Sequence, residues 1–384
     1  MKILLIAPKY TLSSKVTYNY LIPMGLAYIS AVLKKANYDV SCLNLNHHNG
    51  LTNEIVKTEL DKKKYDIVAT GHVAVGYSMI ESILKTAREH PSNPKTILGG
   101  AIITSEPRLM FESLKPDFGV LGEGEVTILE LLKSIEKKKN FNKVNGIMYR
   151  NNVGEIITTP PREPIKNIDK IPFPDYEGFE FEEKLNNTPT NVDNFGTFND
   201  YPRIYQILAS RGCPFHCTFC YHTLGEEYRA RSIGNVIKEI EFAIEKYRIN
   251  SIALLDDLFS YRKERIYEFC EQIKRISKKT NQKIIWSCQL SVSNVDRNLL
   301  KTMKASGCEI INYGFESYSE EVLKSMKKPI TPKQIDMVFK MTLEEKINVQ
   351  ANFIFGDIAE TTQTAKETLD YWKENCKEQV NLSW

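Results

Sequence analysis

The sequence lacks the long apolar run of a membrane span and the dense cysteines of a disulfide-stabilised secreted domain. Only eight of its 384 residues are cysteine, and the opening apolar run at residues 3–7 is far shorter than a signal-peptide core. An excess of charge is missing too, because 51 Lys and Arg face 48 Asp and Glu. These absences argue against a membrane span and a nucleic-acid partner. We therefore expect a cytoplasmic protein in a reducing compartment.

The first 140 residues alternate short apolar runs with amphipathic segments. Helical periodicity covers residues 24–36, 78–90 and 126–138. Five strand-like runs separate such segments, at 3–7, 40–45, 66–70, 95–99 and 117–122. This alternation predicts βαβ units and a parallel sheet. We expect a doubly wound, Rossmann-like (flavodoxin-like) α/β domain over residues 1–140, with its ligand beyond the carboxyl ends of the strands.

Residues 141–203 have a different composition. Two β-rich runs around an Asn-Asn-Val-Gly turn predict a hairpin at 144–159, and seven of the 16 prolines lie in 160–203, which indicates a linker. A second alternation then fills residues 204–384. Its strand-like runs lie at 204–210, 251–256, 283–289, 309–315, 348–356 and 379–384. We predict a partial (β/α)6 barrel, C-terminally short because the chain stops in the sixth run, with its chemistry at the strand carboxyl ends.

Three cysteines lie close together after the first strand of the predicted barrel. Cys213, Cys217 and Cys220 have the spacing Cys-x3-Cys-x2-Cys. Three thiolates can hold three irons of a [4Fe–4S] cluster and leave the fourth iron open. A zinc ion completed by His216 or His222 is the alternative that these residues leave open. The other cysteines lie in apolar contexts typical of buried residues, at Cys42, Cys270, Cys288, Cys308 and Cys376.

The cysteine motif, with Phe219 before its last cysteine, resembles that of the radical S-adenosylmethionine (SAM) enzymes. The resemblance implies that the open iron binds SAM and that one electron then cleaves SAM to a 5′-deoxyadenosyl radical. The ends of later strands also resemble this family, at Asp256-Asp257, GFES (314–317) and NFIFGDIAET (352–361), although an Asp pair can also cap a helix. SAM contacts are thereby implied for Phe219, Asp256, Asp257, Glu316, Ile354 and Gly356.

Two departures accompany this resemblance. Family members often carry a basic residue near position 291, where this chain has Ser291. The pattern also usually has a Pro-His pair after the double glycine of the first domain, where this chain has Ala101-Ile102. The first departure puts in doubt a SAM contact from the third strand of the barrel.

The first domain resembles the cobalamin-binding subfamily of these enzymes, at segments 22–40, 97–107, 120–132 and 168–176. A methylthiotransferase of the same superfamily would hold a second cluster here, but only Cys42 precedes the linker. Glycines at a strand end let a nucleotide tail approach the backbone, since a Cβ would obstruct it. Cobalamin contacts are implied for Tyr10, Gly71, His72, Ser78, Gly99, Gly100, Ile102, Gly122, Glu123 and Gly124.

Structural interpretations of the same residues remain as alternatives to cofactor binding. Residues 122–124 also suit an ordinary helix start, and the first domain could be a nucleotide-type fold that only packs against the barrel. His47 and His48 lie on a polar Asn-rich turn, which predicts a solvated loop. The loop after the first strand, residues 8–14, holds no histidine, unlike the Asp-x-His-x-x-Gly loop of methionine-synthase-type corrinoid proteins. We therefore predict cobalamin with neither its own base nor a histidine beneath the cobalt.

The full resemblance implies an enzyme with three cofactors: a [4Fe–4S] cluster, SAM and cobalamin. Its usual reaction methylates an unactivated carbon or phosphorus centre, through methylcobalamin and a 5′-deoxyadenosyl radical. We expect a small-molecule or peptide substrate of the natural-product type and a flavodoxin or ferredoxin as electron donor. The alternatives are a radical cyclase or rearrangement enzyme, a non-catalytic corrinoid or cluster carrier, and a zinc-stabilised interaction protein.

Overall fold

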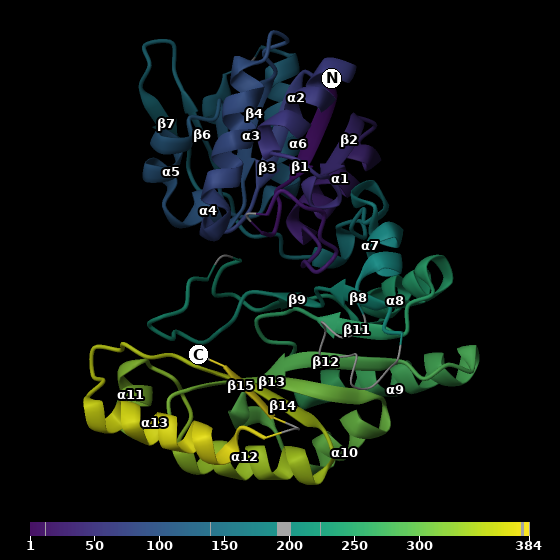
Figure 1. Cartoon of the computed structure of the whole chain (residues 1–384), viewed down its shortest axis with the longest axis vertical. Coiled ribbons are helices and arrows are strands. Elements are labelled where there is room, and N and C mark those ends of the chain that lie inside the picture. The colour runs from purple at the N-terminus through teal and green to yellow at the C-terminus, as the bar shows by residue number, and fades with distance from the viewer. Residues whose placement is uncertain (12, 139, 190–200, 223, 378–379, 384) are drawn as a thin grey trace. The chain divides into compact units, whose positions relative to one another are not determined.

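The computed structural model describes residues 1–11, 13–138, 140–189, 201–222, 224–377 and 380–383. The chain forms two compact units, Met1–Val192 and Asp193–Trp384 (Figure 1). Within the described residues, no helix has both the length and the apolar character that crossing a membrane requires. The domain limits placed at residues 140 and 203 stay a prediction.

A seven-stranded sheet forms the centre of the first unit, in the order β2-β1-β3-β4-β5-β6-β7. The parallel strands are β1 (Lys2–Ala7), β2 (Asp39–Asn44), β3 (Ile67–Gly71), β4 (Lys95–Gly99) and β5 (Phe118–Val120). The predicted hairpin follows as β6 (Ile147–Arg150) and β7 (Ile156–Thr158), which extend the sheet in antiparallel fashion. The order 2-1-3-4-5 of the parallel strands is that of the flavodoxin-like fold, so the predicted fold class is confirmed.

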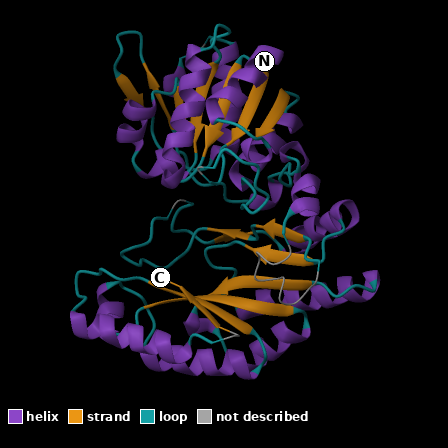
Figure 2. Ribbon diagram, in the orientation of Figure 1, coloured by secondary structure: helices purple, strands orange, loops and turns teal. Residues whose placement is uncertain are grey.

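Helices cover both faces of this sheet, because its central strands are apolar on both sides (Figure 2). The helix after β1 packs beside the last one, and the helices after β2 and β3 pack beside each other. In chain order they are α1 (Met24–Lys35), α2 (Thr52–Lys62), α3 (Tyr77–Glu89), α4 (Ala101–Ser105), α5 (Pro107–Leu114) and α6 (Gly124–Glu136). The carboxyl ends of β1 to β5 therefore share one edge, where the predicted cobalamin residues lie.

Much of the proline-rich segment packs on the first unit. It contains η4 (Ile168–Lys170), η5 (Glu177–Phe179) and α7 (Phe181–Asn187). Phe179 and Phe181 are buried, and Asp175 accepts a hydrogen bond from Ser30 and pairs with Lys34 of α1. This segment is thereby brought back to the helices that precede it by more than 100 residues. Residues 190–200 lie outside the described residues.

A six-stranded sheet, all parallel, forms the second unit in the order β8-β11-β12-β13-β14-β15. Its strands are β8 (Ile204–Ile207), β11 (Ser251–Leu254), β12 (Ile285–Leu290), β13 (Cys308–Glu316), β14 (Asn348–Phe353) and β15 (Val380–Ser383). Each corresponds to one predicted run. In the described residues β8 and β15 do not pair, so the sheet is an open, partial barrel, as predicted.

The helices of the second unit lie on the outer side of its sheet (Figure 2). α8 packs against α9, α9 against α10, and α10 against α12. They are α8 (Ile233–Tyr247), α9 (Lys263–Thr280), α10 (Arg297–Ala305), α11 (Glu320–Ser325), α12 (Pro332–Glu344) and α13 (Thr362–Asn375). Because all the strands are parallel, their carboxyl ends open on one edge, where the chemistry of such barrels lies.

Candidate active site

The cysteine loop is closed at its base by a short ribbon. β9 (Ser210–Arg211) follows β8 and pairs antiparallel with β10 (Arg229–Ala230), so the described residues 212–222 and 224–228 form a loop at the carboxyl end of the first barrel strand. Gly212 has a φ of +78°, and a Cβ there would lie 2.4 Å from the carbonyl oxygen of Glu227. Arg229 also donates to the carbonyl of Leu224 at 2.6 Å. Contacts between the protein's own residues therefore fix the two ends of the loop.

The three cysteines of this loop are accessible. Cys213 and Cys217 are half-buried and Cys220 is exposed. Partial burial raises the pKa of each of the three thiols. The protein alone therefore does not hold them as thiolates, whereas a bound metal deprotonates its thiol ligands. Accessible, clustered thiols of this kind are suited to metal coordination.

The described residues of the loop do not gather its three sulfurs at the spacing of a single zinc ion. A zinc ion lies about 2.3 Å from each thiolate, which brings the sulfurs within roughly 4 Å of one another. Among the described residues, the one group of three potential ligand atoms gathered within 4.8 Å lies in the first unit and contains no cysteine. His222 Nε2 donates to the carbonyl of Phe215 at 2.8 Å, which occupies that nitrogen. The cluster ligands themselves stay a prediction.

The other residues predicted to contact SAM lie at the same edge of the sheet as the cysteines. Parallel pairing aligns the end of β11 with that of β8, and the ends of β13 and β14 with each other. Asp256-Asp257, Glu316 and Ile354 follow or end these strands. Ser291 follows β12, and its hydroxyl contacts that of Ser293 at 2.8 Å. The structure thus gathers the nominated residues, and their contacts with SAM remain a prediction.

The two aspartates after β11 have different environments. Asp256 is fully buried, and its Oδ1 accepts from the backbone N–H groups of Ala209 and Ser210 at 2.7 Å each. Burial raises the pKa of Asp256 to about 7. Asp257 is exposed, and its charge raises the pKa of Cys213 and Cys220. Asp256 therefore supports the backbone that leads to the cysteine loop, and Asp257 is the member of the pair that faces the loop.

Glu316 lies at a bulge where β13 shifts its register with β14. Its φ is +60°, which is unusual for a residue other than glycine, and its side chain is 8% exposed. Oε1 accepts from Lys328 Nζ at 2.7 Å, and the carbonyl of Glu316 accepts from the amide of Ile354 at 2.8 Å. Lys328 was not predicted as part of the site, because a Lys-Lys-Pro segment after a short helix is typical of a solvated helix end.

The glycines nominated for cofactor contact fall into two groups. A Cβ on Gly71 would lie 2.6 Å from the carbonyl oxygen of Gly99, and one on Gly100 would lie 3.0 Å from that of His72, so packing within the protein requires both glycines. At Gly99, Gly122 and Gly356 an added Cβ meets no atom within 4 Å. These three border open space, as the approach of a ligand to the backbone requires.

Some of the other residues predicted to contact cobalamin have exposed side chains, and others are occupied by contacts within the protein. Tyr10 is 51% exposed and Ser78 is exposed, so both side chains are available to a ligand. Ile102 is fully buried in the core, which leaves a contact only to its backbone. Glu123 accepts from the amide of Ile165 at 2.7 Å, and a Cβ on Gly124 would lie 3.0 Å from Ile29.

Two features of this edge were not predicted, namely the exposure of two valines and the burial of a lysine. Val73 and Val75, in the loop after β3, are 47% and 82% exposed, an apolar surface suited to a corrin ring. Lys9 is 3% exposed, and its Nζ lies within hydrogen-bond distance of the carbonyls of Ser14, His48 and Gly50. The sequence gives little indication that Lys9 is buried, because a lysine after a strand is usually solvated. The ammonium group ties together the loops that follow β1 and β2.

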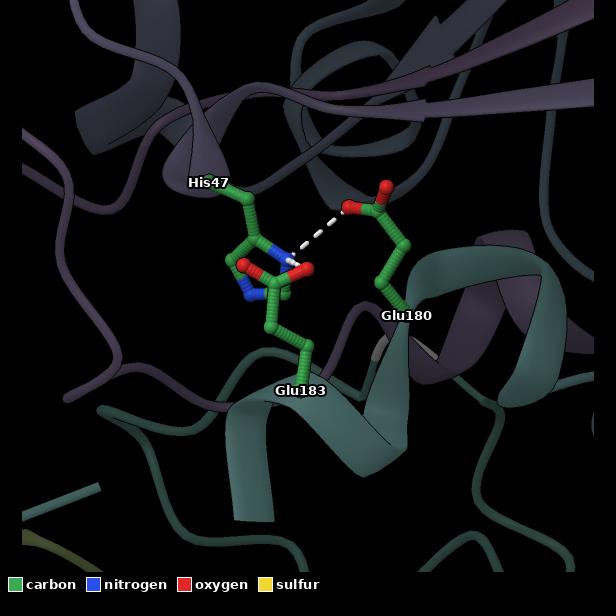
Figure 3. Close-up of side chains that lie close together, drawn as sticks. All are labelled: His47, Glu180 and Glu183. Atoms are coloured by element: carbon green, nitrogen blue, oxygen red, sulfur yellow. Dashed lines mark hydrogen bonds and ion pairs between the residues drawn. The ribbon is translucent and has the colours of Figure 1, made fainter. Parts of the chain in front are cut away.

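His47, in η1 (Leu45–His47), has a buried side chain that lies beside Glu180 and Glu183 (Figure 3), so the prediction of a solvated loop is wrong for this side chain. Its side chain is 2% exposed, with Nδ1 at 2.9 Å from Glu180 and 3.8 Å from Glu183. Nε2 lies 2.7 Å from the hydroxyl of Tyr20, which in turn accepts from Asn44 at 2.7 Å. Because a carboxylate accepts, Nδ1–H donates to Glu180, and Nε2 of the neutral ring then accepts from the hydroxyl of Tyr20. The network joins η1 to the start of α7.

We expect His47→Phe to destabilise the first unit by about 1–3 kcal/mol, because the buried hydroxyl of Tyr20 loses its acceptor. Denaturant unfolding of the full chain measures this change, with His48→Phe as the matched control. His47 lowers the pKa of Glu180, so its contribution is present above the ordinary glutamate pKa and is lost as the pH falls through the lowered value. The difference between the two variants should therefore shrink below about pH 4. Equal stabilities of the two variants at neutral pH would contradict this role.

Comparison with known proteins agrees with this arrangement. Residues 207–371 match the Radical SAM superfamily, and residues 14–132 match the B12 binding domain. A protein of Pyrococcus horikoshii, named as an uncharacterized methyltransferase, is 30% identical over 383 residues, which are 97% of this chain and 78% of that protein. The anaerobic magnesium-protoporphyrin IX monomethyl ester cyclase of Rubrivivax gelatinosus is 27% identical over 378 residues, which are 96% of this chain and 65% of the cyclase.

A solved structure has the same fold. The radical S-adenosylmethionine methyltransferase TsrM from Kitasatospora setae, with cobalamin and a [4Fe–4S] cluster bound, matches with a TM-score of 0.77. The match covers 100% of this chain and 72% of TsrM, at 17% sequence identity.

Proposed function

The chain belongs to the cobalamin-binding radical SAM family, and on that premise we propose that it methylates an unactivated carbon or phosphorus centre of a small-molecule or peptide substrate. The observation that carries the proposal is the cysteine loop at the carboxyl edge of the partial barrel, in a chain whose first unit is a B12-binding fold. The cluster needs a one-electron reductant, and we propose a flavodoxin or ferredoxin as the donor.

The second unit supplies the SAM half of the reaction. When bound, the cluster and SAM together supply a 5′-deoxyadenosyl radical, and cobalamin supplies a methyl group for transfer. Cys213, Cys217 and Cys220 hold the cluster, and Asp256 holds the backbone that carries their loop. The carboxylate of Glu316, whose Oε1 accepts from Lys328, would hold the ribose hydroxyls of SAM.

The first unit supplies the cobalamin half. Gly99 and Gly122 leave open backbone where the nucleotide tail approaches. Exposed Tyr10, Val73 and Val75 offer an aromatic and apolar surface to the corrin ring. These side chains come from loops after different strands of the sheet, in the manner of ligand sites in open α/β folds.

A radical cyclase is the second candidate. The observation that favours it is the likeness to the cyclase of Rubrivivax gelatinosus over 96% of this chain. Both candidates use the same three cofactors, so the products formed from SAM distinguish them.

The test is anaerobic turnover of the reconstituted, cobalamin-loaded protein with SAM and a low-potential reductant, with both products measured. The methyltransferase proposal expects S-adenosylhomocysteine from methyl donation in addition to 5′-deoxyadenosine. 5′-Deoxyadenosine without S-adenosylhomocysteine would favour the cyclase. Neither product from a protein that holds its cluster and cobalamin would overturn both candidates in favour of a carrier.

We further expect bound cob(II)alamin to lack an axial nitrogen ligand, because residues 8–14 contain no histidine. His47 is not free to serve, since its ring nitrogens contact Tyr20 and Glu180. Electron paramagnetic resonance measures this directly, and a triplet splitting from one axial nitrogen would contradict the expectation. His72 then becomes the residue to substitute, because its Nδ1 is buried and has no hydrogen-bond partner among the described residues.

A further inference from the structure

Lys328 lies against the cysteine loop. The amide of Thr218, between Cys217 and Phe219, donates to the carbonyl of Met326 at 3.0 Å and so joins the loop to the segment after α11. Two residues on, Lys328 Nζ lies 5.9 Å from the centroid of the Phe219 ring. The segment 326–328 thus places an ammonium group beside the motif.

The ammonium group is paired with a buried carboxylate. Lys328 Nζ lies 2.7 Å from Glu316 Oε1, and the two side chains are 18% and 8% exposed. An added Cβ on Gly314 would lie 2.1 Å from Oε1 and 2.7 Å from Nζ, so the glycine of the GFES segment leaves the space that the pair fills. A buried ion pair contributes little net stability, which makes a role in positioning the better account of this one.

The positive charge lies at the motif, because Lys328 Nζ is beside the ring of Phe219, the residue that precedes Cys220. A cluster held by three thiolates is anionic and gains a further negative charge when it is reduced, so a nearby cation favours the reduced form. Position 291, where a basic residue was expected, carries a serine that contacts Ser293.

We propose that Lys328 is a positioning residue of the SAM site: it holds the Glu316 carboxylate beside the cysteine loop and offsets part of the negative charge of the reduced cluster. The inference rests on the proposed function, because it requires a cluster on these cysteines. It adds a residue that lies on neither the cysteine motif nor a strand end.

The test is a redox titration of the reconstituted cluster, followed by electron paramagnetic resonance, in Lys328→Met. Lys327→Met is the matched control, because it removes the same charge from the exposed neighbouring residue. At a fixed potential we expect about a ten-fold lower ratio of reduced to oxidised cluster in Lys328→Met, which for a one-electron couple is a shift of about 59 mV to lower potential. Lys328→Arg should restore most of the ratio.

Each outcome has a distinct meaning. Equal potentials in Lys328→Met and Lys327→Met, with iron content unchanged, would overturn the inference. Should Lys328→Met fail to fold, Lys328→Gln removes the charge but keeps a hydrogen-bond donor for Glu316, and a potential equal to that of Lys327→Met would again overturn the inference. A wild-type protein without a cluster would overturn the proposed function itself, so the two failures are distinguishable.

Discussion

We expect the replacement of Cys213, Cys217 and Cys220 by alanine to remove the iron–sulfur cluster entirely. The reconstituted wild-type protein should hold about four irons per chain and show the broad absorbance at the edge of the visible range, whereas the triple variant should show neither. The reason is that a cluster with three protein ligands has no other protein sulfur within the loop to take their place. Iron and sulfide analysis under anaerobic conditions measures the effect.

The control for this prediction uses cysteines in the same unit. Cys270 and Cys308 are fully buried, in α9 and β13 respectively, as the apolar context of each predicted. Burial raises the pKa of each of these thiols, which keeps them protonated and unreactive. Cys270→Ala and Cys308→Ala should therefore retain the full iron content. Loss of the cluster from either variant, with the fold intact, would contradict the assignment to the loop.

The strands of both sheets could be predicted from the sequence, because parallel strands are buried on both faces and appear as short, continuous apolar runs. The run at 95–99 coincides with β4 (Lys95–Gly99). The run at 204–210 was too long, because the chain leaves the sheet after Ile207 and pairs Ser210 with Ala230. That pairing depends on a residue 20 positions downstream, which local periodicity does not register.

The burial of His47 could not be predicted for a related reason. A histidine on an Asn-rich turn is usually solvated, and the side chains that cover this one, Glu180 and Glu183, lie more than 130 residues later. Only the return of the proline-rich segment to the first unit brings them together. Contacts between segments so far apart in sequence leave no local pattern.

The candidate site was predictable in its chemistry and less so in its geometry. The cysteine spacing and the order of the strand ends are local patterns, and they nominated residues that the structure gathers at one edge. Which of Asp256 and Asp257 turns inward depends on where β11 ends relative to the backbone of residues 209–210. Lys328 was not predicted because it follows α11, whereas its partner Glu316 precedes that helix. No helical or strand periodicity relates two residues placed in this way.

Glu316→Ala should weaken SAM binding about ten-fold or more. Hydrogen bonds to a charged group are each worth about 1.5–3 kcal/mol, and about 1.4 kcal/mol is a factor of ten in affinity. The Glu316 side chain is buried at the edge that carries the cysteine loop. Water therefore does not replace its hydrogen bonds to the ligand, as it would at a surface carboxylate. Equilibrium dialysis of SAM against the reconstituted protein measures the change. Glu320→Ala, which removes an exposed carboxylate four residues away, is the matched control.

A comparison of two ligands shows whether the carboxylate binds the ribose or only supports the site. A SAM analogue that lacks one ribose hydroxyl should bind the wild-type protein more weakly than SAM does, because a buried carboxylate then loses its donor. In Glu316→Ala the two ligands should bind equally, since no carboxylate remains to distinguish them. The coupling energy of this cycle isolates the contact from any general loosening of the site, because loosening weakens both ligands alike. Equal discrimination between the ligands in the two proteins, with iron content unchanged, would remove Glu316 from the ribose and leave it as the partner of Lys328 alone.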